Sequence, residues 1–403
     1  MQPQGRTGNR TNLIILSSTL VVVMLGFGMV IPIFPFFVVE RMGAGGSALG
    51  LLVATGSLTE LLFGPLWGSI SDRVGRKPIL MIGMLGYGLS MVLFGLSTEL
   101  WMLFASRALS GVLSAATLAT AMAYIGDSTG DKDRAGGMGA LGGAAGLGII
   151  LGPGLGGWLA GDSLATPFFI AAAMSVASMI LIVLLLPESL PPEARVVHGK
   201  IGLVDFRELR GALRSPIAGL LLLVFIGTIG TSNFEAIFSL YALDVLGYGP
   251  ERVGMILTVV GGVSVIGRGL LTGLATRWWG ETAVIKGALL AGAVAFLLLL
   301  LAETQVAVLL TTGLFVLITA FFRPAVHSLT SQRATVGQGA AMGLSNAFVS
   351  LGRVVGPIWA GAIYDLNTSY PYLSGAVILF IAFLLSLLWM GADKINSSPT
   401  IRC

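Results

Sequence analysis

Charge, cysteine and histidine are all scarce in this sequence. The one cysteine is the last residue, Cys403, which excludes an intrachain disulfide and a cysteine-based metal site. The two histidines, His198 and His327, are too few for a histidine-rich cluster, and no metal site is expected. Asp, Glu, Lys and Arg together make up 10% of the chain, whereas a soluble domain carries about 25%. Water is therefore not the main solvent of this protein.

Long apolar runs take the place of the missing charge. Hydrophobic residues make up 55% of the chain, in stretches of about twenty residues that can cross a roughly 30 Å hydrocarbon core. The runs are continuous, as at 288–302 and 374–390, without the alternation of an outer-membrane barrel. The first run, 13–38, lacks a signal-peptide cleavage site and is expected to be retained. The pattern predicts an all-α integral membrane protein.

Hydropathy predicts twelve transmembrane helices in two six-helix bundles. The first six are expected at 13–38, 48–70, 79–97, 101–125, 136–160 and 166–186, and the others at 216–243, 251–275, 283–301, 304–322, 340–363 and 373–391. The predicted domains are an N-terminal tail (1–12), an N-terminal bundle (13–186), a linker (187–215), a C-terminal bundle (216–391) and a C-terminal tail (392–403). The linker is polar, and it is not expected to form a third domain.

The distribution of Lys and Arg predicts the orientation. If the N-terminus is inside the cell, most of the 23 basic residues lie on the inner side, and only Arg41 and Arg252 lie outside. Acidic residues show no such bias, as expected for a rule that concerns positive charge. Both termini are therefore expected in the cytoplasm, with the chain in the cell membrane.

The two predicted bundles resemble each other in sequence. At an offset of 204 residues, FPFFVVERMG (34–43) aligns with FSLYALDVLG (238–247). At the same offset, Gly152 and Pro153 align with Gly356 and Pro357. At an offset of 205, Gly68 and Gly75 align with Gly273 and Gly280, and Asp72 aligns with Arg277 at the same place in its helix. Two six-helix bundles in pseudo-twofold parallel repeat are typical of transporters that bind substrate between the halves near the middle of the membrane.

The strongest local motif is GPLWGSISDRVGRKP (64–78), at the predicted inner junction of the second and third helices. It resembles the loop signature of the major facilitator superfamily, G-x-x-x-D-R-x-G-R-K/R. The matching positions are Gly68, Asp72, Arg73, Gly75, Arg76 and Lys77. The resemblance implies a conformational latch of the outward-open state. The alternative is that the basic residues only set the topology.

Physical reasoning assigns parts to this motif. Gly68 allows the second helix to approach a neighbour, and Gly75 allows a tight turn. Asp72 can face a helix N-terminus, while Arg76 can reach a carboxylate. The predicted carboxylate partner is Asp127, at the end of the fourth helix in YIGDSTGDKDR. Arg134 follows seven residues later, and this segment also resembles the superfamily pattern.

The fourth and fifth helices carry two more resemblances. Arg107, followed by Gly111, resembles the superfamily element R-x-x-x-G, and implies substrate binding or proton coupling rather than a purely structural arginine. In the fifth helix, GIILGPGLGG (148–157) resembles the element G-x-x-x-G-P-x-x-G-G of the superfamily's antiporters, and implies export. The residues of that element are Gly148, Gly152, Pro153, Gly156 and Gly157. Generic close packing of small residues is the alternative.

Two carboxylates inside predicted helices are the candidate proton carriers, Glu60 and Glu235. A carboxyl group buried away from water is more easily protonated, and each can also pair with an intramembrane arginine. The other candidate cavity residues are Arg107, Asn233, Arg268 and Arg353. His198 in the linker and His327 just past the tenth predicted helix are not well placed for this role.

No nucleotide-binding loop is present, because the glycine-rich segment 140–148 is not followed by Gly-Lys-Ser/Thr. The energy must then come from an ion gradient; the candidate carboxylates and the resemblance to antiporters imply the proton gradient, and no cofactor is expected. No catalytic motif is recognised either, so an enzyme is not expected.

Over 13–391 the chain resembles the drug:proton antiporter group of the superfamily, although its first helix lacks the acidic residue that many members carry. The resemblance implies proton-coupled export of small apolar or amphipathic compounds, as in multidrug and tetracycline exporters. The alternatives are an exporter of a specific metabolite, such as a sugar, amino acid or lipid-like molecule, and a membrane sensor that no longer transports. The expected partners are a small-molecule substrate, protons and the lipid bilayer, without nucleic acid, and the expected state is a monomer.

Overall fold

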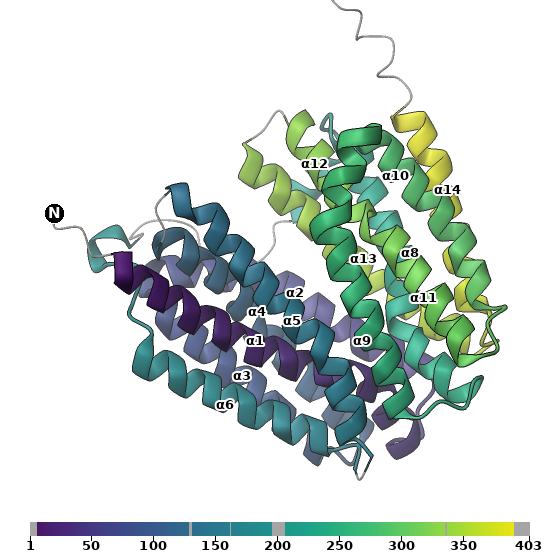
Figure 1. The fold of residues 1–403 in the computed structure, drawn as a ribbon, viewed down its shortest axis with the longest axis horizontal. Coiled ribbons are helices and arrows are strands. Elements are labelled where there is room, and N and C mark those ends of the chain that lie inside the picture. Colours follow the sequence, from purple (N-terminus) through teal and green to yellow (C-terminus); the bar gives the residue numbers. More distant parts are fainter. Residues whose placement is uncertain (1–5, 129–130, 162, 196–205, 335–336, 391–403) are drawn as a thin grey trace, which may run out of the picture. The chain divides into compact units, whose positions relative to one another are not determined.

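The computed structural model describes residues 6–128, 131–161, 163–195, 206–334 and 337–390. These residues form helices and connecting turns, with no strand among them (Figure 1). The all-α fold that hydropathy predicts is confirmed.

Most of the helices are long enough to cross a membrane. In the first part of the chain they are α1 (Arg6–Phe36) with the π-helical turn η1 (Phe37–Arg41), α2 (Gly46–Val74), α3 (Arg76–Leu96), α4 (Leu100–Ser128), α5 (Asp131–Leu159) and α6 (Thr166–Leu185). Two short helices follow, η2 (Pro192–Ala194) and α7 (Phe206–Ala212). The remaining helices are α8 (Ala218–Asp244), α9 (Pro250–Ile266), the π-helical turn η3 (Gly267–Leu271), α10 (Thr272–Leu299), α11 (Gln305–Ala320), α12 (Phe322–Arg333), α13 (Gln338–Tyr364) and α14 (Tyr370–Trp389).

The described residues contain 11 candidate membrane spans, one of which, Pro250–Leu299, is 50 residues long. That span is interrupted at Gly280, whose φ of 76° and ψ of 156° are not helical. It therefore contains two of the predicted crossings, and the remaining spans each contain one. The eleven candidate spans therefore correspond to the twelve predicted membrane crossings.

One predicted boundary is wrong. The tenth helix was expected to end at residue 322, but α11 continues with only a one-residue interruption into α12, and the combined span ends at Arg333. Hydropathy falls in α12 because Arg323, His327 and Gln332 are polar. His327 consequently lies on a helix of the span and not past it.

The chain forms two compact units. Unit 1 comprises Met1–Asp205 and Ile237–Gly261, and unit 2 comprises Phe206–Ala236 and Gly262–Cys403. Helices α8 and α9 thus each contribute to both units. The domain limits expected from the sequence, 13–186 and 216–391, stay a prediction.

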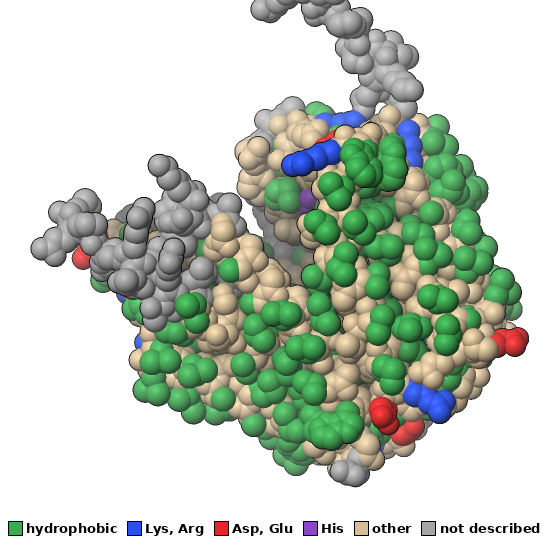
Figure 2. Space-filling model, in the orientation of Figure 1, with side chains coloured by type: hydrophobic (Ala, Val, Ile, Leu, Met, Phe, Trp, Pro, Cys, Tyr) green, Lys and Arg blue, Asp and Glu red, His purple; other side chains and the backbone are tan. Residues whose placement is uncertain are grey.

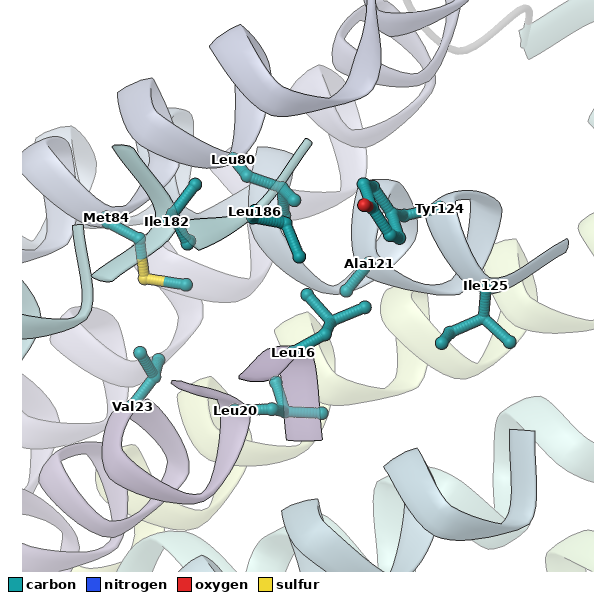
Figure 3. Close-up of a cluster of buried hydrophobic side chains, with 10 residues drawn as sticks. All are labelled: Leu16, Leu20, Val23, Leu80, Met84, Ala121, Tyr124, Ile125, Ile182 and Leu186. Atoms are coloured by element: carbon teal, nitrogen blue, oxygen red, sulfur yellow. The ribbon is translucent and has the colours of Figure 1, made fainter. Parts of the chain in front are cut away.

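A hydrophobic cluster joins four helices of unit 1 (Figure 3). Its members come from α1, α3 and α4 and from the end of α6: Leu16, Leu20, Val23, Leu80, Met84, Ala121, Tyr124, Ile125, Ile182 and Leu186. The one polar tip in the cluster is satisfied, since the Tyr124 hydroxyl donates to the Pro187 carbonyl at 2.8 Å. Burial of these side chains fixes the ends of α3 and α4 that carry the predicted latch.

Large apolar side chains also lie on the outside of the helices. Trp158, Leu184 and Leu388 are 69%, 72% and 72% exposed, and hydrophobic side chains predominate on the face shown in Figure 2. So much exposed apolar surface is unfavourable in water, but lipid tails solvate it.

The backbone confirms the internal repeat. In the described chain, the residues with positive φ are four glycines that pair at the predicted offsets: Gly43 (63°) with Gly247 (64°), and Gly75 (116°) with Gly280 (76°). A side chain at any of these positions would be strained. The same turns therefore recur at equivalent places in both halves of the sequence.

Packing around other glycines repeats as well. Gly152 lies against Gly28 on α1, where an added Cβ would come within 2.6 Å of its Cα. The equivalent Gly356 lies against Ile229 and Ser232 on α8, with the Ile229 carbonyl oxygen 2.9 Å from the added Cβ. Because 28 and 232 differ by the same offset as 152 and 356, the first and fifth helices of each half pack alike.

Candidate functional site

Arg76 is the centre of the predicted latch. Its side chain is only 9% exposed, and its Nε donates to Asp127 Oδ2 at 2.8 Å. It also forms an ion pair with Asp72 one helical turn earlier and donates to the Ser71 hydroxyl at 2.7 Å. The structure thus brings together α2, α3 and the end of α4 through one guanidinium.

The N-terminus of α3 binds Glu188, a residue that sequence reasoning placed in the linker. Glu188 accepts hydrogen bonds from the backbone N–H groups of Arg76 (2.8 Å) and Lys77 (3.1 Å). A carboxylate at this position satisfies free N–H groups and favours the positive end of the helix dipole. Glu188 thus occupies the N-terminus of α3 and Asp72 pairs with Arg76, while the expectation that Asp72 faces a helix N-terminus stays a prediction.

The other latch positions have separate surroundings. Lys77 Nζ donates to the Val183 carbonyl at 2.8 Å, which ties α3 to α6. Among the described residues, a Cβ on Gly68 would meet nothing within 4 Å, and the expected approach of a neighbouring helix at this glycine stays a prediction. Arg73 lies in the last turn of α2. Arg134 lies in α5, and its side chain is outside the described residues.

Arg107 occupies a space left by a glycine. A Cβ on Gly56 of α2 would overlap the Arg107 Nε and lie 2.7 Å from its Cζ. The guanidinium carbon lies 5.6 Å from the centre of the Phe34 ring, a cation–π distance. Glu60 and Tyr87 are within electrostatic range, but the buried Nε has no hydrogen-bond partner. The structure therefore places Arg107 and Glu60 in one neighbourhood of unit 1.

Gly111 explains how α4 comes close enough to α2 for this arrangement. A Cβ at Gly111 would overlap the Thr59 hydroxyl and lie 2.7 Å from the Gly56 carbonyl oxygen. The spacing of Arg107 and Gly111 thus allows close contact between two helices and the insertion of an arginine one turn away. Sequence reasoning identified Gly111 and missed Gly56.

The glycines of the α5 element form a close contact with α1. Gly148 faces Met24 and Leu25, Gly152 faces Gly28, and a Cβ on Gly156 would overlap the Met29 carbonyl oxygen. Glycines four residues apart allow such backbone contact between membrane helices.

Another face of the same α5 element meets the start of α9, which belongs to the same unit. A Cβ on Gly157 would overlap the Pro250 carbonyl oxygen. Gly154 lies opposite the Thr258 hydroxyl. Pro153 lies directly between Gly152 and Gly154, inside the helix, where it removes one backbone hydrogen bond.

Unit 2 contains a second pair of opposite charges. Arg353 Nη2 on α13 lies 4.0 Å from Glu235 Oε2 on α8, which is too long for a hydrogen bond. The two side chains are 43% and 51% exposed, and Glu60 is exposed as well. Both carboxylates are thus accessible in the structure, and their place in a cavity stays a prediction.

The two remaining candidate cavity residues, Asn233 and Arg268, have different surroundings. Asn233 is 0% exposed and its amide donates to the Ser374 hydroxyl on α14 at 3.3 Å, so its side chain faces a helix contact. Arg268 lies in η3 and is exposed.

A family model described as Major Facilitator Superfamily matches residues 16–336. The chain belongs to this superfamily. It is 33% identical to Multidrug resistance protein 2 of Bacillus subtilis (strain 168) over 98% of each chain. It is also 33% identical to Multidrug resistance protein 1 of the same organism, over 96% of this chain and 98% of that protein. Quinolone resistance protein NorA of Staphylococcus aureus (strain COL) is 29% identical over 89% of this chain and 93% of its own.

Solved structures of the superfamily share the fold. The human organic anion transporter MFSD10 (TETRAN) has a TM-score of 0.68 at 23% identity, with 96% of this chain and all of that chain covered. A point mutant of the nucleoside transporter NupG has a TM-score of 0.77 at 13% identity, with 96% and 100% covered. The major facilitator fold predicted from the sequence is confirmed, and the chain is a membrane transporter.

Arg323 of this major facilitator chain was missed as a site candidate, and His327 was set aside as not well placed. Arg323 on α12 is within electrostatic range of Arg353, Glu235 and Arg268, and His327 follows one turn later, within range of Arg323. The signal was available in the sequence. Buried apolar residues continue at helical spacing past residue 322, as the positions Phe322, Ala325, Val326 and Leu329 show.

Proposed function

We propose that this transporter is a proton-coupled antiporter that exports small apolar or amphipathic compounds, as a multidrug efflux protein does. The observation that carries the proposal is the near full-length similarity to two Bacillus subtilis proteins named for multidrug resistance. The glycine contacts of α5 with α1 and α9 support antiport, because they involve the element that resembles the superfamily's antiporters.

Glu60 and Glu235 are the proposed proton carriers, with the proton gradient as the energy source and no cofactor. Each lies near an arginine of its own unit, Glu60 near Arg107 and Glu235 near Arg353. Protonation neutralises the carboxylate and frees the arginine, so a pair of this kind acts as a switch. The long distance between Glu235 and Arg353 suits a pair that has to separate in every cycle.

The latch around Arg76 tunes the balance between the two states of alternating access. Exposed ion pairs stabilise by only about 0–1 kcal/mol, whereas hydrogen bonds to charged groups contribute about 1.5–3 kcal/mol. The contact of Arg76 with Asp127 is the stronger kind, since the arginine is nearly buried. A contribution of this size shifts the populations of two states without deciding whether the protein folds.

The proposed location is the cell membrane, with both termini in the cytoplasm, and the proposed working form is a monomer. The positive-inside distribution supports this orientation: Arg73, Arg76, Lys77 and Arg333 fall on the proposed inner side.

Reconstituted vesicles test the proposal. The purified chain is placed in vesicles that contain a pH-sensitive dye, a quinolone is added, and proton movement is recorded. Wild-type protein is expected to move protons when the quinolone is added, whereas Glu60→Gln and Glu235→Gln are expected to reduce the rate strongly. Glu303→Gln, in the exposed turn between α10 and α11, is the matched control. Wild-type rates in both helix variants would rule out these carboxylates.

A further inference from the structure

Positive charge exceeds negative charge in the middle of unit 2. Arg353 on α13 lies 4.0 Å from Glu235 on α8, and Arg323 on α12 is within electrostatic range of both residues and of Arg268 in η3. All four residues belong to the same compact unit. Each lies inside a candidate membrane span, away from both of its ends. Arg323 therefore lies within electrostatic range of two other guanidinium groups and of one carboxylate, all inside candidate membrane spans.

The one carboxylate does not satisfy these arginines. Glu235 lies 4.0 Å from Arg353, and within the described chain the Arg323 guanidinium has no hydrogen-bond or ion-pair partner. Glu281, the other acidic residue of unit 2 that lies within a span, is beside the break at Gly280 and accepts hydrogen bonds from Ser328 and Gln332. An arginine inside a membrane protein requires a counter-charge or access to water.

The cluster is open to a ligand. The Arg353 and Glu235 side chains are 43% and 51% exposed, and Arg268 is exposed. A guanidinium group presents paired N–H donors that match a carboxylate, sulfonate or phosphate. The described residues thus offer a positively charged, accessible set of donors where the transporter's own acidic groups are too few.

We propose that Arg323, with Arg353 and Arg268, binds the negatively charged group of the substrate, so that amphipathic organic acids are a substrate class of this transporter. The inference rests on the proposed export function and specifies its substrate. An incoming carboxylate competes with Glu235 for Arg353, which lies 4.0 Å from it.

Binding of two probes of opposite charge tests the site directly. The full chain in a neutral detergent is titrated with 2-naphthoate and with 2-naphthylmethylammonium, which share the same apolar body. Wild-type protein is expected to prefer the naphthoate. Arg323→Gln is expected to weaken naphthoate binding about tenfold or more, the loss of roughly one charge-assisted hydrogen bond. Arg323→Lys keeps the charge and is expected to retain part of the affinity.

Controls separate a lost site from a lost fold. Lys286→Gln removes one positive charge from α10 in the same unit and is expected to bind naphthoate like the wild type. Unchanged binding of the ammonium probe by Arg323→Gln shows that this variant is folded. Equal naphthoate affinity of Arg323→Gln and wild-type protein overturns the inference. Wild-type preference for the ammonium probe overturns it as well.

Two further readouts identify the occupant. If phosphatidylglycerol displaces naphthoate and vesicles containing the protein do not transport naphthoate, the cluster binds lipid headgroups and the substrate assignment is wrong. Transport of naphthoate that depends on Arg323 but moves no protons supports the site and refutes the proposed proton coupling. Proton-coupled export of the ammonium probe without naphthoate binding supports the proposed proton coupling and refutes the anion-binding site.

Discussion

Replacing Gly56 with alanine should abolish transport while leaving the fold nearly intact. The added Cβ overlaps Arg107 Nε and lies 2.7 Å from Cζ and 2.9 Å from Nη2. All three atoms belong to the far end of a flexible side chain, so the arginine can swing away while the backbone of α2 and α4 stays in place. The variant thereby moves Arg107 from its position beside Glu60 and Phe34 without removing it.

The structure supplies two matched variants that set the magnitude. Gly64 lies on the same helix with nothing within 4 Å of an added Cβ, so Gly64→Ala should change stability by no more than the roughly 1 kcal/mol of helix propensity. Gly111→Ala meets the Gly56 carbonyl oxygen at 2.7 Å, and this backbone atom cannot move away. Overpacking of that kind costs about 1–3 kcal/mol. The free energy of unfolding of Gly56→Ala should be close to that of Gly64→Ala and clearly higher than that of Gly111→Ala.

The assay combines thermal unfolding in detergent with proton movement in vesicles. Gly56→Ala should unfold within a few degrees of wild-type protein but move protons as slowly as Arg107→Gln. Combining Gly56→Ala with Arg107→Gln should cause no further loss, because both act on the same guanidinium. If Gly56→Ala moves protons at the wild-type rate, the position of Arg107 is not important for coupling and the reasoning is refuted.

Two other sites give predictions of stability. Glu188→Ala should lower the free energy of unfolding by about 1–2 kcal/mol, because the first N–H groups of α3 lose their acceptor. Glu188→Gln should lower it less, because the amide oxygen still accepts. Equal melting temperatures for the wild type and both variants would contradict the capping role. Gly156→Ala should be strongly destabilised, by about 1–3 kcal/mol, because its Cβ overlaps a backbone carbonyl of α1. Gly142→Ala, in the same helix but with open space, should melt like the wild type.

Hydropathy and glycine spacing were sufficient to predict the helices and the repeat, because both reflect general constraints. A bilayer requires about twenty apolar residues for each crossing, and a backbone turn with positive φ requires glycine. Gly75 and Gly280 could therefore be aligned without a structure. The position of Arg76 near Asp127 was also accessible, since both residues lie at helix ends that an up-and-down bundle brings to the same side.

Contacts that depend on the path of the chain could not be predicted in this way. Glu188 follows α6 in a polar segment, and only the fold brings it to the N-terminus of α3. Asn233 was interpreted as a cavity residue because polar groups in apolar helices often have a function, but its amide nitrogen donates to a hydroxyl on α14. Arg323 was missed because hydropathy averages over a window, whereas a helix with one apolar face continues beyond the point where the average falls.

The equivalent helix junctions of the two sequence halves are formed by different side chains, so we expect their contributions to stability to differ. At the offset of 205 residues, Arg76 and Asp127 correspond to Glu281 and Gln332, and Glu281 Oε1 accepts a hydrogen bond from Gln332 Nε2 at 2.8 Å. The geometry is kept, but an amide replaces one charged partner. Asp127→Asn removes one of the two counter-charges of the nearly buried Arg76 and leaves Asp72, while Glu281→Gln retains an oxygen that accepts from Gln332. Because removing one charge from a nearly buried ion pair is more destabilising than weakening a hydrogen bond between accessible side chains, Asp127→Asn should lower the melting temperature in detergent clearly more than Glu281→Gln. Equal shifts would mean that charge at the first junction adds nothing to its geometry.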